Sequence, residues 1–303
     1  MEPFELLNLS KISRRTERIV QSLSSRKRTY EIRLGITSGP SVTFRGSEVH
    51  WEVISTEDKN KNNVIEPYFH DLLLLYEYSE NELQHFKENF EYIKRILNCP
   101  ITAVFYELSA FFPNNKVIID WLKSHRESIE ELDVYSSSGH DDDLRYLLSN
   151  VKATDYLKIH ARNELHFDWN DLLPQNIHFL HIEAPKNISF QQLMKTNSRT
   201  IILQNSKITS REIKLFLKSW MKSESHLNLG SFEVNLEDHE AMDTILDLPH
   251  EYVTYETART FKGYKTYRTE VYSGNEIKQS SGKTAVMGSA TSGDNVYFKL
   301  FVV

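Results

Sequence analysis

Gly282-Lys283-Thr284 has the residue types of a phosphate-binding loop, in which backbone amides and a lysine cradle the phosphates of a nucleotide. That motif needs four residues between its two glycines, whereas seven separate Gly274 from Gly282 here. The residues that follow, 285–287, predict a strand where the motif requires a helix. We therefore interpret this stretch as the turn of a β-hairpin.

The run His140-Asp141-Asp142-Asp143 offers nitrogen and oxygen ligands for a metal ion in four consecutive residues. Consecutive residues of a helix point about 100 degrees apart, so such side chains rarely converge on one ion. Carboxylates in a first helical turn interact favourably with the helix dipole. The run predicts the start of a helix rather than a metal site.

His160 and His181 occupy outward and equivalent positions of two adjacent predicted strands, and His178 precedes the second strand. A zinc site would need at least one further ligand and a supporting second shell. We interpret the pair as part of a solvated or binding face. An enzyme assembled across the loops of the fold remains an alternative, with these two histidines as its first candidates.

Motifs of other enzyme classes are absent or isolated. Ser24 to Lys27 and Ser219 to Lys222 match the Ser-x-x-Lys pattern of some acyl enzymes, but neither has the companion motifs. The sequence holds no Gly-x-Ser-x-Gly, His-Glu-x-x-His or Gly-x-Gly-x-x-Gly. We expect a binding protein rather than an enzyme, with no cofactor and no metal.

Composition narrows the class of protein. At 303 residues, the chain has room for about two domains or one elongated domain. Its net charge of -6 argues against a dedicated nucleic-acid binder. A single cysteine, Cys99, points to a reducing compartment, and the longest aliphatic run, 72–75, is far too short to cross a membrane. We expect a cytoplasmic or nuclear protein with neither nucleic-acid nor membrane partners.

The first hundred residues predict helices around a small antiparallel sheet. Residues 1–25 read as an amphipathic helix for whose apolar side the sequence offers no partner. Alternating apolar residues predict strands between Tyr30 and Val53, before a polar loop at 55–63. Ser79 and Glu82 have the spacing of a capping box, which predicts a helix that Cys99-Pro100 ends.

Beyond residue 100, a short apolar strand recurs, each time followed by a polar turn and a helix or loop. The strand cores are Val104-Phe105-Tyr106, Leu132-Asp133-Val134, Leu157-Lys158-Ile159, Leu180-His181-Ile182, Ile201-Ile202-Leu203 and Phe232-Glu233-Val234. Their first residues are 28, 25, 23, 21 and 31 residues apart. One strand per 20 to 30 residues predicts an α/β fold that is a degenerate, leucine-rich-repeat-like short solenoid of parallel strands and helices.

Helical connectors and a final sheet complete this prediction. Helices are expected at 114–125, 141–150 and 209–221, the last with a capping box formed by Thr209 and Glu212. After Pro249 the pattern predicts antiparallel strands at 264–272, 284–287 and 296–303, with turns at 273–275 and 280–282. These strands would cap the open end of the solenoid.

The outward positions of solenoid strands form the natural recognition surface. The candidate target-binding residues are Tyr135, Tyr156, Lys158, His160, His181, Glu183 and Gln204. Aromatic and charged side chains mix there, as they do at protein interfaces. An ordinary polar surface with a few aromatic residues is the alternative.

Several stretches resemble the F-box-associated proteins that are expanded in nematodes. Residues 3–16, Pro-Phe-Glu-Leu-Leu-Asn-Leu-Ser-Lys-Ile-Ser-Arg-Arg-Thr, resemble the second half of the F-box. Further matches are Ser225-His226-Leu227-Asn228-Leu229, Leu248-Pro249-His250-Glu251 and Gly282-Lys283-Thr284-Ala285. Their order and spacing extend the resemblance over nearly all of the chain.

The resemblance implies a substrate-recognition subunit of an SCF-type cullin-RING ubiquitin ligase. The F-box would dock on a Skp-family adaptor, and through it on a cullin, while the associated domain would hold an unknown target protein for ubiquitin-dependent degradation. The implied division is a partial helical F-box at 1–27, an F-box-associated domain at 28–250, and a C-terminal antiparallel β cap at 251–303. The adaptor contacts would come from Leu6, Leu7, Leu9 and Ile12.

The first half of the family's F-box, with its Leu-Pro pair, has no counterpart in this sequence, so the F-box is expected to be truncated at its N-terminus. The alternative function is therefore a truncated relative that binds a target protein as a scaffold, without association with a ligase.

Overall fold

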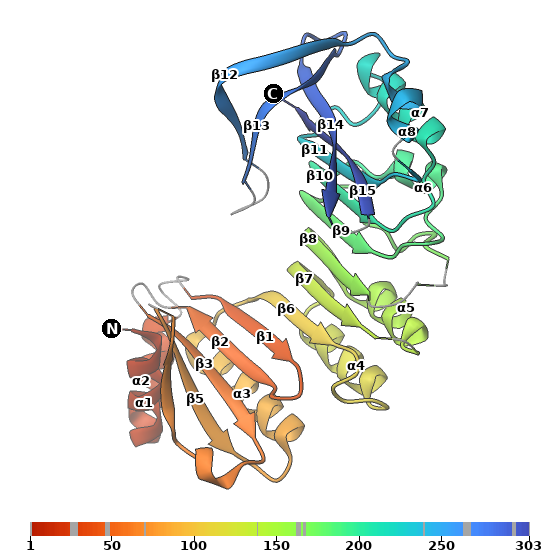
Figure 1. Cartoon of the computed structure of the whole chain (residues 1–303). Coiled ribbons are helices and arrows are strands. Elements are labelled where there is room, and N and C mark those ends of the chain that lie inside the picture. The colour runs from red at the N-terminus through yellow and green to blue at the C-terminus, as the bar shows by residue number, and fades with distance from the viewer. Residues whose placement is uncertain are drawn as a thin grey trace. The chain divides into compact units, whose positions relative to one another are not determined.

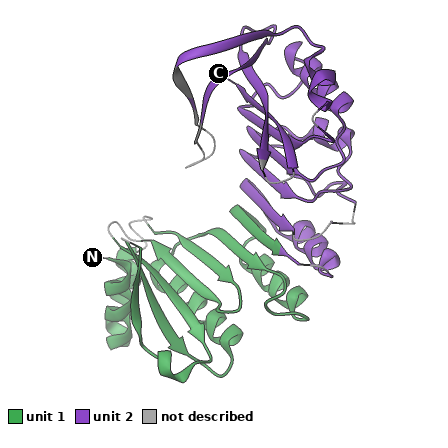
Figure 2. Ribbon diagram, in the orientation of Figure 1, with its two compact units in different colours: residues 1–135 green, residues 136–303 purple. Residues whose placement is uncertain are grey.

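The computed structural model describes residues 2–24, 30–45, 49–69, 71–137, 139–161, 165, 168–238, 240–262, 268–292 and 295–302. The chain forms two compact units, Met1–Tyr135 and Ser136–Val303, which are coloured separately in Figure 2. We describe each unit by itself.

Unit 1 is a mixed sheet with helices (Figure 1). Its elements are α1 (Pro3–Ile12), α2 (Arg14–Ser24), β1 (Ile32–Ile36), β2 (Ser41–Arg45), β3 (His50–Thr56), the short 3-10 helix η1 (Lys59–Lys61), β4 (Ile65–Tyr68), β5 (Leu72–Tyr78), α3 (Glu82–Leu97), β6 (Ile101–Glu107), α4 (Asn115–His125) and β7 (Ser128–Ser136), whose last residue falls in unit 2. The strand order is β7-β6-β1-β2-β3-β5-β4. Strands β1, β6 and β7 are parallel, and β1, β2 and β3 form an antiparallel meander.

The predicted strands of unit 1 are confirmed at β1, β2 and β3, but two further strands were missed. The aliphatic run 72–75 is the start of β5, which pairs in parallel with β3, and β4 forms the edge beyond it. A continuous apolar run has no alternation, so its period does not distinguish a strand from a helix. The expected loop at 55–63 begins later than predicted, because β3 continues to Thr56, and η1 lies within it.

The single helix expected over 1–25 is two helices, α1 and α2, in the described residues. Ser13 between them is extended, and its backbone N–H and its hydroxyl both hydrogen-bond the hydroxyl of Thr16. The apolar side of the pair does have a partner, since both helices pack on α3. Arg95 of α3 bonds Glu17 at 2.6 Å, and Val20 is fully buried. The partner was invisible in the sequence because it lies some 75 residues further along the chain.

The capping box predicted at Ser79 is wrong. The N-cap of α3 is Asn81, whose side chain accepts a hydrogen bond from the backbone of Gln84 at 3.0 Å. The Ser79 hydroxyl instead accepts from the backbone of Asn81, and Glu82 accepts from the backbone of Glu57. Asparagine is as good an N-cap as serine, so spacing alone did not choose between them.

The only cysteine, Cys99, lies buried just before β6. Burial raises the pKa of its thiol to about 12. The thiolate is the reactive form, so we expect iodoacetamide at pH 8 to modify the folded chain at least about 100-fold more slowly than the chain in denaturant. Mass spectrometry of timed samples measures both rates, and equal rates would contradict the buried placement.

Unit 2 continues with parallel strands and helices and ends in antiparallel strands (Figure 1). Its elements are α5 (Asp141–Asn150), β8 (Lys152–Ala161), β9 (Phe179–Glu183), α6 (Phe190–Lys195), β10 (Thr200–Gln204), α7 (Ser210–Met221), β11 (Ser231–Asn235), α8 (Ala241–Leu246), β12 (Glu251–Lys262), β13 (Arg268–Lys278), β14 (Thr284–Ser292) and β15 (Asn295–Val302). The strand order is β12-β13-β14-β15-β11-β10-β9-β8.

The strands and helices that the repeat predicts are confirmed within each unit. All six predicted strand cores lie in strands, from β6 and β7 of unit 1 to β8, β9, β10 and β11 of unit 2. Strands β8, β9, β10 and β11 are parallel to one another. The predicted helices are α4, α5 and α7, and the box of Thr209 and Glu212 caps α7 as expected.

The C-terminal strands cover the edge of β11, as predicted. Strand β15 pairs antiparallel with β11, and β14, β13 and β12 follow in order. The turn at 280–282 is confirmed, with Gly282 at φ +95. The turn predicted at 273–275 is wrong, since β13 runs through it. Gly274 serves close packing there, because a Cβ would come within 2.5 Å of the Val286 side chain.

The predicted strand at 264–272 is shifted. Residues 268–272 belong to β13, whereas 264–267 lie outside the described residues. Strand β12, which the sequence pattern did not predict, pairs with β13 instead.

No helix among the described residues is long and apolar enough to cross a membrane.

A buried histidine makes the stability of unit 2 depend on pH. Burial lowers the pKa of His226 from its ordinary value of 6.5, and the hydrogen bond to the Leu193 carbonyl opposes this only in part. The unfolded chain therefore binds more protons than the folded chain as the pH falls below about 6.5. We expect the free energy of unfolding to decrease from that pH downwards.

His226→Asn should remove this part of the pH dependence, since asparagine does not titrate and tolerates the left-handed backbone at this position, φ 53. Urea unfolding at pH 7.5 and pH 5.5 measures the slope for both chains. An equal loss of stability in both would show that His226 is not the group responsible.

Candidate functional site

The strand face of unit 2 consists of the side chains of β8–β11 and β15 on the side of the sheet opposite α7. Phe232 packs on Phe216 of α7 with 4.5 Å between ring centroids, so its neighbour Glu233 points to the opposite face. The strand registers align three rows across this face: Tyr156, Phe179, Thr200, Ser231 and Phe301; Lys158, His181, Ile202, Glu233 and Lys299; His160, Glu183, Gln204, Asn235 and Tyr297.

Two histidines and a glutamate meet at the β8–β9 end of the strand face. Nδ1 of His160 lies 3.0 Å from Oε1 of Glu183, and Nε2 of His181 lies 4.0 Å from the same oxygen. The prediction that the two histidines occupy equivalent positions is wrong. His181 pairs with Lys158, whereas His160 lies in the next row, opposite Glu183. The ring centroids are 6.3 Å apart. Within the described ranges, no group of three or more His, Cys, Asp or Glu side chains is placed to hold a metal ion.

A second polar group lies at the β10–β15 end of the strand face. Glu233 is 9% exposed and accepts an ion pair from Lys299 at 3.0 Å and a hydrogen bond from Gln204 at 3.5 Å. Such charge-assisted bonds hold the carboxylate in one position. Lys299 was missed in the sequence because only the antiparallel pairing of β15 brings it beside Glu233.

Aromatic side chains stand at both ends of the first row of the strand face. Tyr156 stacks on Phe179 with ring centroids 4.6 Å apart and planes 8° from parallel. Tyr135, the remaining candidate residue, belongs to unit 1, where it is 40% exposed and lies 5.1 Å from the ring of Phe105. The structure thus brings together six of the seven predicted target-binding residues on one sheet face.

Both glutamates of this face are held by neighbouring side chains, Glu183 by His160 and Glu233 by Lys299. The stacked rings of Tyr156 and Phe179 lie on the same face. Mixed aromatic and charged surfaces of this kind bind proteins through stacking and charge complementarity.

The four residues implied in adaptor binding are divided by the structure. Leu6 and Leu7 are each 5% exposed and hold α1 in the core of unit 1. Leu9 is half-buried, and Ile12 is 72% exposed. Phe4 of the same helix stacks on Trp51 of β3, with 3.7 Å between centroids.

Helix α2 also has exposed apolar side chains, which the amphipathic pattern placed together with the other apolar residues on one side of the helix. Val20 is buried, whereas Ile19 and Leu23 are each 48% exposed. Their spacing of four residues puts them on one face of α2, so this face is open for a partner. Val20 and Ser24, four residues apart, are the buried residues of α2 and fix its rotation, and the sequence did not reveal which apolar residue would be buried.

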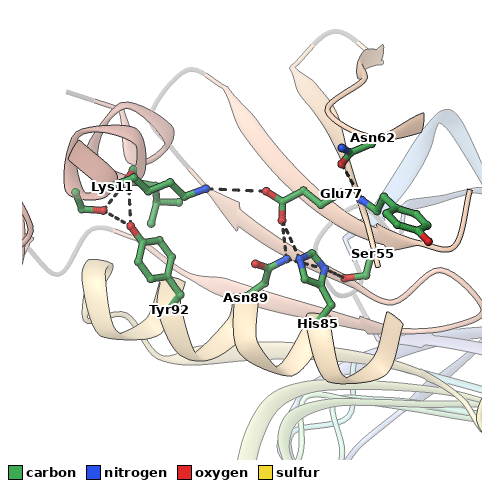
Figure 3. Close-up of polar contacts among 10 residues, drawn as sticks. Lys11, Ser55, Asn62, Glu77, His85, Asn89 and Tyr92 are labelled. Atoms are coloured by element: carbon green, nitrogen blue, oxygen red, sulfur yellow. Dashed lines mark hydrogen bonds and ion pairs between the residues drawn. The ribbon is translucent and has the colours of Figure 1, made fainter. Parts of the chain in front are cut away.

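A serine, a histidine and a carboxylate also meet in unit 1 (Figure 3). Ser55 hydrogen-bonds Nδ1 of His85 at 3.0 Å, and Nε2 of His85 lies 3.7 Å from Glu77. Ser55 is completely buried, so no substrate can reach its hydroxyl. Glu77 also accepts a hydrogen bond from Asn89 at 2.8 Å and an ion pair from Lys11 at 4.0 Å. The network links α1 to β5 and α3, and its role is structural.

The two other motifs have structural roles as well. Lys283 follows the turn at Gly282 and precedes β14, which confirms the hairpin interpretation. Helix α5 begins at Asp141 and carries its three aspartates in the first turn, as predicted. In the Ser-x-x-Lys matches, Ser219 lies in α7, and 25–27 lie outside the described residues.

Comparison with known proteins gives one match. Residues 168–234 match the family model described as F-box associated. This stretch contains β9, α6, β10, α7 and β11, and therefore three of the four parallel strands that carry the strand face. No curated protein and no solved structure matches the chain. The resemblance drawn from the sequence is confirmed for this stretch.

Proposed function

We propose, from the F-box-associated match over residues 168–234, that the chain is the substrate-recognition subunit of an SCF-type cullin-RING ubiquitin ligase. The strand face of unit 2 would bind the target protein, and a partial F-box at 1–27 would bind a Skp-family adaptor. The observation that supports this most directly is that the matched stretch contributes three strands, β9, β10 and β11, to the strand face.

No bond is made or broken in this proposal by the chain itself. Its contribution is proximity: holding a target lysine near the loaded conjugating enzyme turns an encounter in solution into a reaction within one complex. Paired ionisable groups on a rigid sheet suit this role, because they orient a bound protein without reacting with it.

The adaptor contact would use the apolar side chains that α1 and α2 leave exposed. These are Ile12 of α1 together with Ile19 and Leu23 of α2, with half-buried Leu9 beside Ile12 in sequence. Full burial of such a side chain contributes about 1.5–3 kcal/mol before the cost of ordering.

Calorimetry with a purified Skp-family adaptor tests the ligase half of the proposal. We expect the 303-residue chain to bind, and Ile12→Glu with Ile19→Glu to weaken binding at least about 100-fold, since both changes place charge in an apolar contact. Ile65→Glu is the matched control, because Ile65 is 51% exposed on β4, away from α1 and α2 in sequence. Thermal unfolding should be the same for all three chains, and absence of adaptor binding at tens of micromolar would refute this half.

A second function is favoured by one observation. Leu6 and Leu7, two of the four residues expected to contact the adaptor, are used within unit 1. A chain whose N-terminal helices serve its own fold could act as a protein-binding scaffold without a ligase. Recovery of a target protein with no adaptor or cullin in the same purification would favour that function.

A further inference from the structure

A trough of about 760 Å³ lies in unit 2 at the edge where the parallel strands begin. Its lining comes from the starts of β8, β9, β10 and β11, the end of β15 and the residue before β14. It is separate from the strand face, whose residues lie further along the same strands. None of the residues predicted from the sequence to bind a target protein lines it.

The repeats place an asparagine at the same point of the trough three times. Asn176, Asn197 and Asn228 each stand three residues before the first residue of β9, β10 and β11. Those first residues are direct partners in the sheet, so the asparagines follow one another across the strands. The side chain of Asn197 donates to that of Asn176 at 3.2 Å. An amide side chain both donates and accepts, which suits it to the backbone of an extended peptide.

The position two residues after each asparagine sets the charge of the trough. Directly before β9 it is His178, which is paired with Asp155, and directly before β10 it is Arg199. Directly before β11 it is Gly230, whose missing side chain leaves room for Arg199: a Cβ there would lie 3.2 Å from Cγ and 3.4 Å from Nε of that arginine. The glycine therefore allows Arg199 to lie against the next repeat.

A second cation stands at the same end. Lys283 lines the trough and donates one of its three N–H bonds to the carbonyl of Leu227 at 2.5 Å, which fixes its position. Among the described residues that line the trough there is no aspartate or glutamate. A chain of net charge -6 thus carries a local site for anions, built by Arg199 and Lys283.

We propose that this trough binds an extended, acidic peptide segment of the target protein. The asparagines would bond its backbone, and Arg199 and Lys283 would pair with its carboxylates. Four steps of about 4.8 Å separate the five strands at this edge, so about six extended residues cross it. The inference rests on the proposed target-binding function and adds to it the chemistry of the segment that is recognised.

Fluorescence anisotropy with two labelled peptide mixtures tests the trough on the full chain. Both mixtures are octapeptides with six varied positions, and the two fixed positions hold glutamate in one mixture and glutamine in the other. We expect the glutamate mixture to bind at least about tenfold more tightly, and Arg199→Gln and Lys283→Gln each to weaken it about tenfold. Lys222→Gln is the matched control, since this exposed lysine lies outside the trough.

Gly230→Ala offers a test that changes no charge. Its methyl group would crowd Arg199, so the glutamate mixture should bind less well while circular dichroism shows a folded chain. Equal binding of the two peptide mixtures, or full binding by Arg199→Gln, would overturn the proposal. So would tighter binding of a labelled RNA oligonucleotide than of the glutamate mixture, because the trough would then serve a nucleic acid.

Failure of the trough can be told apart from failure of the proposed function. If the Arg199→Gln, Lys283→Gln chain captures the same target protein as the unchanged chain, the trough is refuted while target binding stands. If the unchanged chain captures neither adaptor nor target, the proposed function is refuted whatever the peptides do.

Discussion

Replacing Leu6 with glutamate is expected to lower the free energy of unfolding by at least about 3 kcal/mol. The side chain is 5% exposed between α1 and the rest of unit 1, so the change removes apolar packing and buries a carboxylate without a cation. Ile12→Glu, six residues further along the same helix, should change the unfolding free energy by no more than about 0.5 kcal/mol, because Ile12 is 72% exposed.

Urea unfolding followed by circular dichroism measures both chains. The comparison decides whether α1 belongs to the fold of unit 1 or is free to dock elsewhere. A harmless Leu6→Glu change would contradict the packing of α1 on α3, and it would return Leu6 and Leu7 to the set of residues available for an adaptor.

Trp220→Ala is expected to destabilise unit 2 by about 3–5 kcal/mol. Trp220 is completely buried on α7, and its backbone carbonyl accepts a hydrogen bond from the buried side chain of Gln279 at 2.9 Å. The residue therefore stands where the parallel repeat meets the C-terminal strands. A cavity there should loosen the cap formed by β14 and β15 together with α7.

Leu215→Ala on the same helix is the matched control. Leu215 is 52% exposed, so its loss should cost less than about 1 kcal/mol. Urea unfolding followed by circular dichroism distinguishes the two variants. Similar losses for both would contradict the rotation of α7 that buries Trp220.

The parallel repeat could be predicted because each repeat of the sequence carries its own pattern of apolar residues. An apolar triplet such as Ile201-Ile202-Leu203 marks a buried strand, and the capped stripe from Thr209 to Trp220 marks the helix that covers it. Neighbouring units repeat the pattern, so the stacking follows from local information.

What the sequence did not reveal depends on contacts between distant segments. Tertiary contacts determine three of these features: the pairing of β5 with β3, the packing of α1 and α2 on α3, and the register that sets His181 beside Lys158. A one-residue difference in register changes which side chains are neighbours on a face, and no local pattern fixes it.

The trough does have a recognisable pattern in the sequence. The asparagines that line the trough recur at a fixed distance before three successive strands, at 176, 197 and 228. Reading the repeat for polar residues at equivalent positions, and not for apolar ones alone, would have found them. The role of Gly230 beside Arg199 needed the structure, because it depends on a close approach across two repeats.

We propose that one chain joins an adaptor to a target protein that is bound on the strand face of unit 2. The most direct measurement is affinity purification of the unchanged chain and of a Lys158→Glu, His181→Ala chain, with adaptor, cullin and target quantified by mass spectrometry. We predict adaptor and cullin in constant proportion with both chains, and a target that the altered strand face loses at least about tenfold. Equal recovery of the target by both chains, or the absence of adaptor and cullin from both, would contradict the account.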